Sequence, residues 1–131
     1  MVEINAYSKA ASGGKQLSAH FKVREFACGD GSDAVLVSPR LVMVLETIRA
    51  HFGSAVTINS GYRTPQYNEK VGGAEHSQHC YGTAADISVR GQTPAAVAAY
   101  ARELMPDWGG VGVYDSFCHI DVREAKADWT G

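Results

Sequence analysis

The sequence predicts a single small α+β domain, with a mainly antiparallel sheet and helices packed to one side. Two capped amphipathic patterns, at 38–53 and 93–105, indicate helices, and short β-type patterns at 55–59, 83–89 and 109–123 indicate strands. The order is helix, strand, irregular segment, strand, helix and hairpin, which is typical of α+β proteins. The 131 residues fit one domain with one modest core, so we expect residues 1–131 to form a single unit.

The N-terminal residues, MVEINAYSKAASGGKQ, are mostly small and polar. We therefore expect residues 1–17 to form a loose N-terminal lead-in. The stretch also lacks the basic segment and apolar core of a signal peptide, which predicts synthesis in the cytoplasm without an export signal of its own. Apolar runs such as AVLV and LVMVL are too short to cross a bilayer, so we expect no membrane insertion.

The clearest helix lies at 38–53. Ser38 can cap it, Pro39 suits its first position and Gly53 can end it. Its apolar residues recur at helical spacing and form one face for packing: Leu41, Val44, Leu45, Ile48 and Phe52.

The remaining elements follow from turn residues and alternation. AVTIN (55–59) reads as a strand, followed by the turn-like segment SGYRTPQYN (60–68). TAADISV (83–89) is a second strand, and Thr93 and Pro94 open a helix over 93–105. The segment 109–123 predicts a hairpin that turns near Asp115 and Ser116.

Composition excludes several classes of protein. Apolar residues make up 45% and charged residues 20% of the chain, which is typical of a globular domain. A formal charge of -2 gives no electrostatic reason to expect nucleic acid as a partner, and we expect a monomer. Three cysteines without a CxxC pair form neither a disulfide framework nor a thiolate zinc cluster. We interpret Cys80 and Cys118 as small buried hydrophobes and leave open whether they approach each other.

A set of polar residues stands among small and apolar ones. His79 and Asp86 are seven residues apart, which would separate them by more than about 20 Å in an extended chain, but Gly82 lets the chain fold back. In FCHIDV, alternation places His119 and Asp121 on one face of a strand. Each pattern alone is more often structural. Together, two imidazoles and one carboxylate fit a catalytic zinc site with a fourth position for water.

Three ordered motifs carry a family resemblance: SGYRTPQYN, VGGAEHSQHCYGTAADI and GGVGVYDSFCHIDVR. Together they resemble the M15 zinc peptidases, the D-alanyl-D-alanine carboxypeptidase-like group that also includes phage endolysin peptidases. The resemblance covers roughly residues 18–124, and LSAHFKVREFACGDGSD is similar to the lead-in of the small phage-type subgroup, subfamily A of this family. It implies an M15- and hedgehog-like fold.

The resemblance also implies roles for individual residues. His79, Asp86 and His119 match the zinc ligands, and Arg63 matches an arginine that holds a substrate carboxylate or carbonyl oxygen. A planar guanidinium suits that task, although a structural salt bridge is the alternative for Arg63. Ser77 matches a motif serine that could bind substrate or shape its loop.

The general base departs from the family pattern. Better-known members carry an acidic residue three positions before the last zinc histidine, where this chain has Ser116. We favour Asp121 as the base, because alternation points it into the site. Asp121 as a partner that orients His119 is one alternative, Asp115 as the base is another, and a missing base is a third.

The resulting hypothesis is a zinc metallopeptidase that hydrolyses bonds next to D-amino acids in peptidoglycan stem peptides. Whether it trims a terminal D-alanine or cuts within the stem or cross-link stays open. Such an enzyme would act on the cell wall, and it could be encoded by a phage or prophage. The alternative is a non-catalytic M15-like module that binds cell wall or serves in a phage particle, because hedgehog domains use a similar fold for binding.

Overall fold

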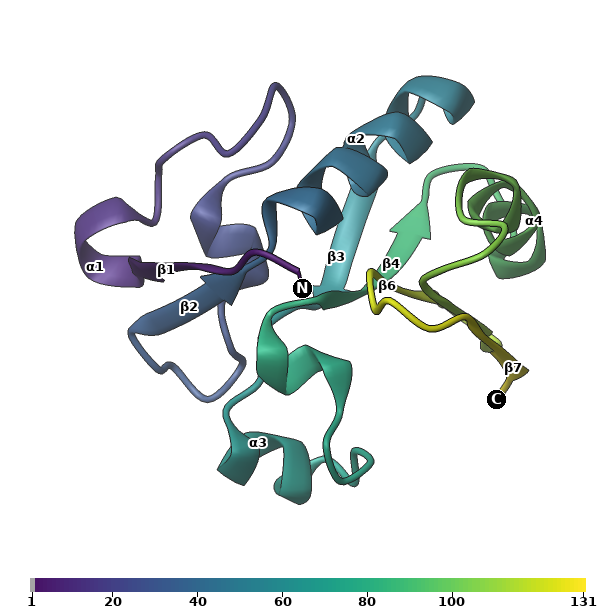
Figure 1. The fold of residues 1–131 in the computed structure, drawn as a ribbon. Helices are drawn as coiled ribbons and strands as arrows, with labels where there is room; N and C mark the ends of the chain where they lie inside the picture. Colours follow the sequence, from purple (N-terminus) through teal and green to yellow (C-terminus); the bar gives the residue numbers. More distant parts are fainter. Residues whose placement is uncertain (1) are drawn as a thin grey trace.

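The computed structural model describes residues 2–131 and contains a five-stranded sheet at its centre (Figure 1). The strands are β3 (Val56–Ser60), β4 (Ala84–Val89), β5 (Gly110–Val113), β6 (Cys118–Asp121) and β7 (Ala127–Thr130), in the spatial order β3-β4-β6-β5-β7. Every pairing in this sheet is antiparallel except that of β5 with β7, which is parallel. The expected mainly antiparallel sheet is confirmed.

Two helices pack against this sheet and bury the core. They are α2 (Pro39–Phe52) and α4 (Pro94–Leu104), and the core cluster joins their apolar side chains to those of the strands. On β6, Cys118 and Ile120 belong to this cluster, whereas the alternate residue His119 does not. Strand alternation therefore gives the sheet a core side and a second side, and confirms the predicted α+β class.

The predicted caps of α2 are confirmed. Ser38 accepts a hydrogen bond from the backbone N–H of Leu41, Pro39 opens the helix, and Gly53 ends it in the left-handed conformation with φ of 61°. The helix α4 begins in the same way, since the Thr93 hydroxyl accepts from the N–H of Ala96. No helix in the described part of the chain is long and apolar enough to cross a membrane.

The prediction of a loose lead-in at residues 1–17 is wrong for the residues that the structure describes, and Met1 lies outside them. Strand β1 (Asn5–Ser8) pairs antiparallel with β2 (Ala34–Val37), and helix α1 (Lys9–Ser12) follows β1. Asp33 fixes the start of α1, because its carboxylate accepts hydrogen bonds from the Ser8 hydroxyl and the N–H of Ala10. These elements lie together on one side of the molecule (Figure 1).

The turn-like segment 60–68 was also predicted incompletely, because it contains the start of helix α3 (Pro65–Lys70). Thr64 caps α3 by accepting from the N–H of Tyr67, so Thr64 and Pro65 give the same signal as Thr93 and Pro94. Two 3₁₀ helices complete the fold, η1 (Val23–Phe26) and η2 (Gln78–Tyr81).

Candidate metal centre

Strand register brings the predicted metal-binding residues together on the side of the sheet away from the core. Asp86 on β4 lies directly opposite His119 on β6. His79 lies on η2, which ends at Gly82 with φ of 76°. A side chain at Gly82 would also collide with the backbone of Leu36, so only glycine allows the chain to turn back here. The expected fold-back at Gly82 is confirmed.

The three side chains offer donor atoms in the arrangement of a metal site. One donor atom from each of His79, Asp86 and His119 lies within 4.8 Å of the other two. Asp86 Oδ1 is 3.2 Å from His79 Nε2 and 3.1 Å from His119 Nδ1. Donors bound at about 2.0–2.1 Å to a tetrahedral zinc ion lie about 3.3 Å apart. Two of the three donor separations therefore match an edge of a zinc tetrahedron, and the third is no longer than 4.8 Å, so these residues could hold the ion.

The outer nitrogen of each histidine has its own partner. His79 Nδ1 lies 2.7 Å from the carbonyl oxygen of Gly61, and His119 Nε2 lies 2.8 Å from Asp121 Oδ2. Both partners accept, so each outer nitrogen carries a proton and donates it. The other nitrogen of each ring faces Asp86, to which it donates when the ring is protonated. Loss of that inner proton leaves the tautomer that metal binding requires, with a lone pair toward the metal position.

The buried charges in the site support one another. Burial raises the pKa of Asp86, but hydrogen bonds from His119 and His79 outweigh burial and hold that pKa well below its ordinary value. Burial likewise raises the pKa of Asp121, but hydrogen bonds from His119 and Arg123 lower it by more, so that pKa also lies well below its ordinary value. Burial lowers the pKa of His119, but Asp121 and Asp86 raise it by more. Both aspartates therefore stay ionised in the folded chain.

Arg63 lies against the far oxygen of Asp86. Its Nη2 is 3.4 Å from Asp86 Oδ2, its Nε donates to the Ser60 hydroxyl, and its Nη1 donates to Asn68 Oδ1. The guanidinium has five N–H groups, so two remain after these three contacts. Arg63 lines a cavity of about 440 Å³ together with the three donor residues, and the remaining N–H groups are available to a ligand there.

The comparisons with known proteins agree with this geometry. The model of the peptidase M15 family matches residues 12–121, which is most of the chain. The chain belongs to the peptidase M15 family. A zinc D-Ala-D-Ala carboxypeptidase from Streptomyces albus G is 41% identical to this M15 chain over 59 residues, which are 44% of the chain and 23% of that relative. The chain thus matches about a quarter of the length of this curated relative.

The family membership confirms the predicted resemblance to the M15 peptidases. The zinc in the prediction agrees with the name of the Streptomyces relative. The structure brings His79, Asp86, His119 and Arg63 around one cavity, as the motifs predicted. Ser77 also lines this cavity, and its hydroxyl accepts from the N–H of His79 at the start of η2. That contact is of the loop-shaping kind, and the substrate-binding role of Ser77 stays a prediction.

Asp121 does not occupy the position that we predicted for a general base. Its side chain is fully buried, it lies behind His119, and it does not line the cavity. Strand alternation gave the correct face of β6 but not the depth. The geometry matches the alternative role, in which Asp121 orients His119. Asp115 is exposed at the hairpin turn and also lies outside the cavity lining.

The sequence patterns did not indicate several residues of the site. Arg123 holds Asp121 through two side-chain hydrogen bonds, from Nε at 2.9 Å and from Nη2 at 2.6 Å. Trp129 on β7 packs its ring 4.9 Å from that of His119. Spacing could have indicated Arg123, since it lies two residues beyond Asp121 in the same extended segment, but no local signal places β7 beside β5.

The three cysteines are free thiols. Cys118 lies in the core cluster on the side of β6 away from the metal centre, and burial raises its pKa to about 12. This matches the interpretation of Cys118 as a buried hydrophobe. Cys80 is half-buried on η2 and is not bonded to Cys118.

Proposed function

We propose that this M15 chain is a zinc-dependent peptidase that hydrolyses bonds next to D-amino acids in peptidoglycan stem peptides. The observation that carries the proposal is the convergence of His79 Nε2, Asp86 Oδ1 and His119 Nδ1 on one point at the wall of a cavity. Support for the substrate class comes from the relative named as a zinc D-Ala-D-Ala carboxypeptidase.

His79, Asp86 and His119 would hold the zinc ion. When bound, zinc supplies a Lewis acid for the scissile carbonyl and lowers the pKa of a bound water toward about 7. Gly61 and Asp121 keep the two rings in the required tautomer, and Arg123 keeps Asp121 ionised. Arg63 neutralises the second oxygen of Asp86 and so holds that carboxylate in place.

Arg63 also provides the anchor for the substrate. Its two unused N–H groups match a carboxylate or a carbonyl oxygen of a peptide in the cavity. Binding by Arg63 would orient the peptide relative to the metal centre, which converts binding energy into correct alignment. A free D-alanine carboxylate would favour terminal trimming, whereas an internal carbonyl at the same place would favour the endolysin type of cleavage.

The proton of the attacking water needs an acceptor other than Asp121. Among the described residues that line the cavity, the carboxylates are those of Asp86 and Glu75. Because Asp86 is committed to the metal set, we assign the proton acceptor to the carboxylate of Glu75. The Glu75 side chain is 91% exposed and its carboxylate lies 3.8 Å from His76 Nε2, so it would leave only this exposed contact when it turns toward a bound peptide.

The test is incubation of purified peptidoglycan, and of a short peptide ending in D-alanyl-D-alanine, with the zinc-loaded chain. The fragments are then identified by mass spectrometry. We expect zinc-dependent loss of D-alanine or cleavage within the stem or cross-link, strongly reduced in Glu75→Gln and retained in Asp115→Asn. No zinc-dependent product would contradict catalysis. Sedimentation of the chain with peptidoglycan, without a product, would instead establish the non-catalytic binding module.

A further inference from the structure

The C-terminal strand β7 builds one wall of the cavity, and it lies beyond the segment 12–121 that the family model matches. Strand β7 pairs parallel with β5, which places Trp129 opposite Gly112. A side chain at Gly112 would collide with the indole, so glycine at this position leaves room for the Trp129 ring beside His119. Trp129 and Tyr114 both line the cavity that holds the metal donors.

Trp129 fixes the hydroxyl of Tyr114. The indole Nε1–H donates to the Tyr114 oxygen at a distance of 2.9 Å. The Tyr114 ring stacks on Phe117 with ring centres 4.5 Å apart, and the backbone of Gly131 packs against its edge. These contacts hold the ring in one orientation.

The hydroxyl proton of Tyr114 has no acceptor among residues 2–131. An indole nitrogen is only a donor, so the Tyr114 oxygen is the acceptor in its contact with Trp129, and its own O–H is left to donate elsewhere. A phenol held in this way presents a proton to whatever occupies the cavity. The acceptor groups of a peptide are its carbonyl oxygens and its terminal carboxylate.

We propose that Tyr114 is a substrate-binding residue whose hydroxyl donates a hydrogen bond to a peptide carbonyl or carboxylate oxygen, and that Trp129 positions this hydroxyl. Arg63, which contacts Asp86, lines the same cavity as Tyr114. Arg63 and Tyr114 would therefore bind the same peptide. The inference rests on the proposed peptidase function and names a determinant of its substrate binding.

The substitutions Tyr114→Phe and Trp129→Phe test this inference. The first removes the hydroxyl, the second removes the indole N–H, and each keeps an aromatic ring. Binding of a D-alanyl-D-alanine peptide to the metal-free protein is measured by calorimetry, and kcat/KM is measured on the zinc-loaded protein. We expect Tyr114→Phe to weaken binding and kcat/KM by about tenfold, the value of one hydrogen bond. Zinc content and melting temperature should stay unchanged, and Tyr7→Phe, outside the cavity lining, is the matched control.

Trp129→Phe should lose part of the same effect, and the double variant should lose no more than Tyr114→Phe alone, because both changes act through one hydroxyl. Unchanged binding and kcat/KM in Tyr114→Phe would overturn the inference and leave the peptidase function standing. Fully additive losses in the double variant would overturn the positioning role of Trp129. If the unsubstituted protein neither binds nor cleaves the peptide, the proposed function fails, and this inference fails with it.

Discussion

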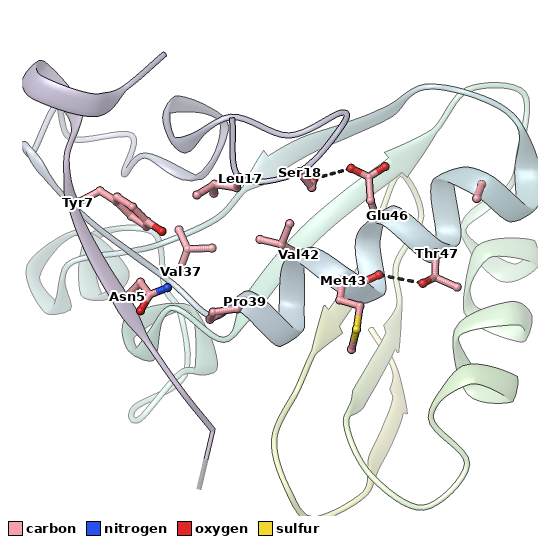
Figure 2. A pocket seen from close by; sticks show the side chains of 11 residues that line it. Asn5, Tyr7, Leu17, Ser18, Val37, Pro39, Val42, Met43, Glu46 and Thr47 are labelled. Carbon is pink, nitrogen blue, oxygen red and sulfur yellow. Dashed lines mark hydrogen bonds between the residues drawn. The ribbon is translucent and has the colours of Figure 1, made fainter. Parts of the chain in front are cut away.

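Two cavities of this molecule differ in chemistry more than in size. The N-terminal groove is lined by residues of β1, α2 and the segment before η1, and has a volume of about 580 Å³ (Figure 2). The metal cavity is smaller, at about 440 Å³. The groove contains one carboxylate, that of Glu46, which accepts hydrogen bonds from the Ser18 hydroxyl and from the backbone N–H of His20. The metal cavity contains three donor atoms that face one point.

The difference shows that the direction of polar groups, and not volume, identifies the site. In the groove, the Glu46 carboxylate accepts hydrogen bonds from residues 18–20 and so holds this segment against α2. Most of the groove lining is apolar. In the metal cavity, the partners on the outer side of the two histidines turn the inner nitrogens toward Asp86, where they can bind a metal once deprotonated. Arrangements of the second kind are the ones that bind metal.

The largest effect is expected from removing a metal donor. His79→Ala leaves two of three donors, so zinc content should fall from about one ion per chain to near zero. Glu46→Gln, the matched change in the groove, should leave zinc content unchanged. Mass spectrometry of the purified, dialysed proteins measures both. Full zinc occupancy in His79→Ala would contradict the assignment of this site.

A smaller loss of zinc affinity is expected when His119 stays in place but the negative charge of Asp121, its hydrogen-bond partner, is removed. Asp121→Asn should weaken zinc binding by about 10-fold to 100-fold, as is usual for partners of metal-binding histidines. Competition with a chelator of known affinity measures the change, and Asp115→Asn at the exposed turn is the control. If Asp121→Asn bound zinc normally but lost kcat, Asp121 would be the general base after all.

Arg63→Gln should lower kcat/KM by about 10-fold to 30-fold, because a charge-assisted hydrogen bond to the substrate is lost. The measurement is steady-state hydrolysis of a D-alanyl-D-alanine peptide, with Arg90→Gln on the exposed surface as control. An amidated peptide, which lacks the terminal carboxylate, should respond less to Arg63→Gln if Arg63 binds that group. An equal loss with both peptides would assign Arg63 to a carbonyl oxygen.

The smallest effect is expected in the groove and concerns stability. Burial raises the pKa of Glu46, but hydrogen bonds from Ser18 and His20 outweigh it and lower that pKa below its ordinary value. The stabilisation is therefore fully present above the unfolded-state pKa of about 4.3 and is lost as pH falls through the lower folded-state value. Glu46→Gln should cost about 1–2 kcal/mol of unfolding free energy at pH 7 and less in acid. Urea titrations at several pH values measure this, and an equal cost at every pH would contradict it.

The sequence allowed the prediction of the elements whose signals are local. Thr or Ser caps followed by proline gave α2 and α4 to within two residues at each end, and alternation gave β4 and the hairpin. The helix α3 has the same Thr-Pro signal, but the glycine and polar residues around it favoured a turn. Strands β1 and β7 are short and depend on partners far along the chain, so local propensity does not reveal them.

The metal donors could be predicted because their motifs fix both residue type and spacing. The depth of Asp121 could not, since alternation gives the face of a strand but not what covers that face. Here Arg123 and the ring of His119 enclose the carboxylate. Trp129 was missed for a similar reason, because it reaches the site only through the parallel pairing of β7 with β5.

The most direct test of the central claim is X-ray absorption spectroscopy at the zinc edge of the zinc-loaded chain. The donor set of His79, Asp86 and His119 predicts a first shell of nitrogen and oxygen atoms at about 2.0–2.1 Å, with multiple scattering from two imidazole rings. Cys80, directly after His79 and half-buried, is the nearest competing ligand in the sequence. A sulfur atom at about 2.3 Å, or scattering from fewer than two imidazoles, would contradict the proposed centre.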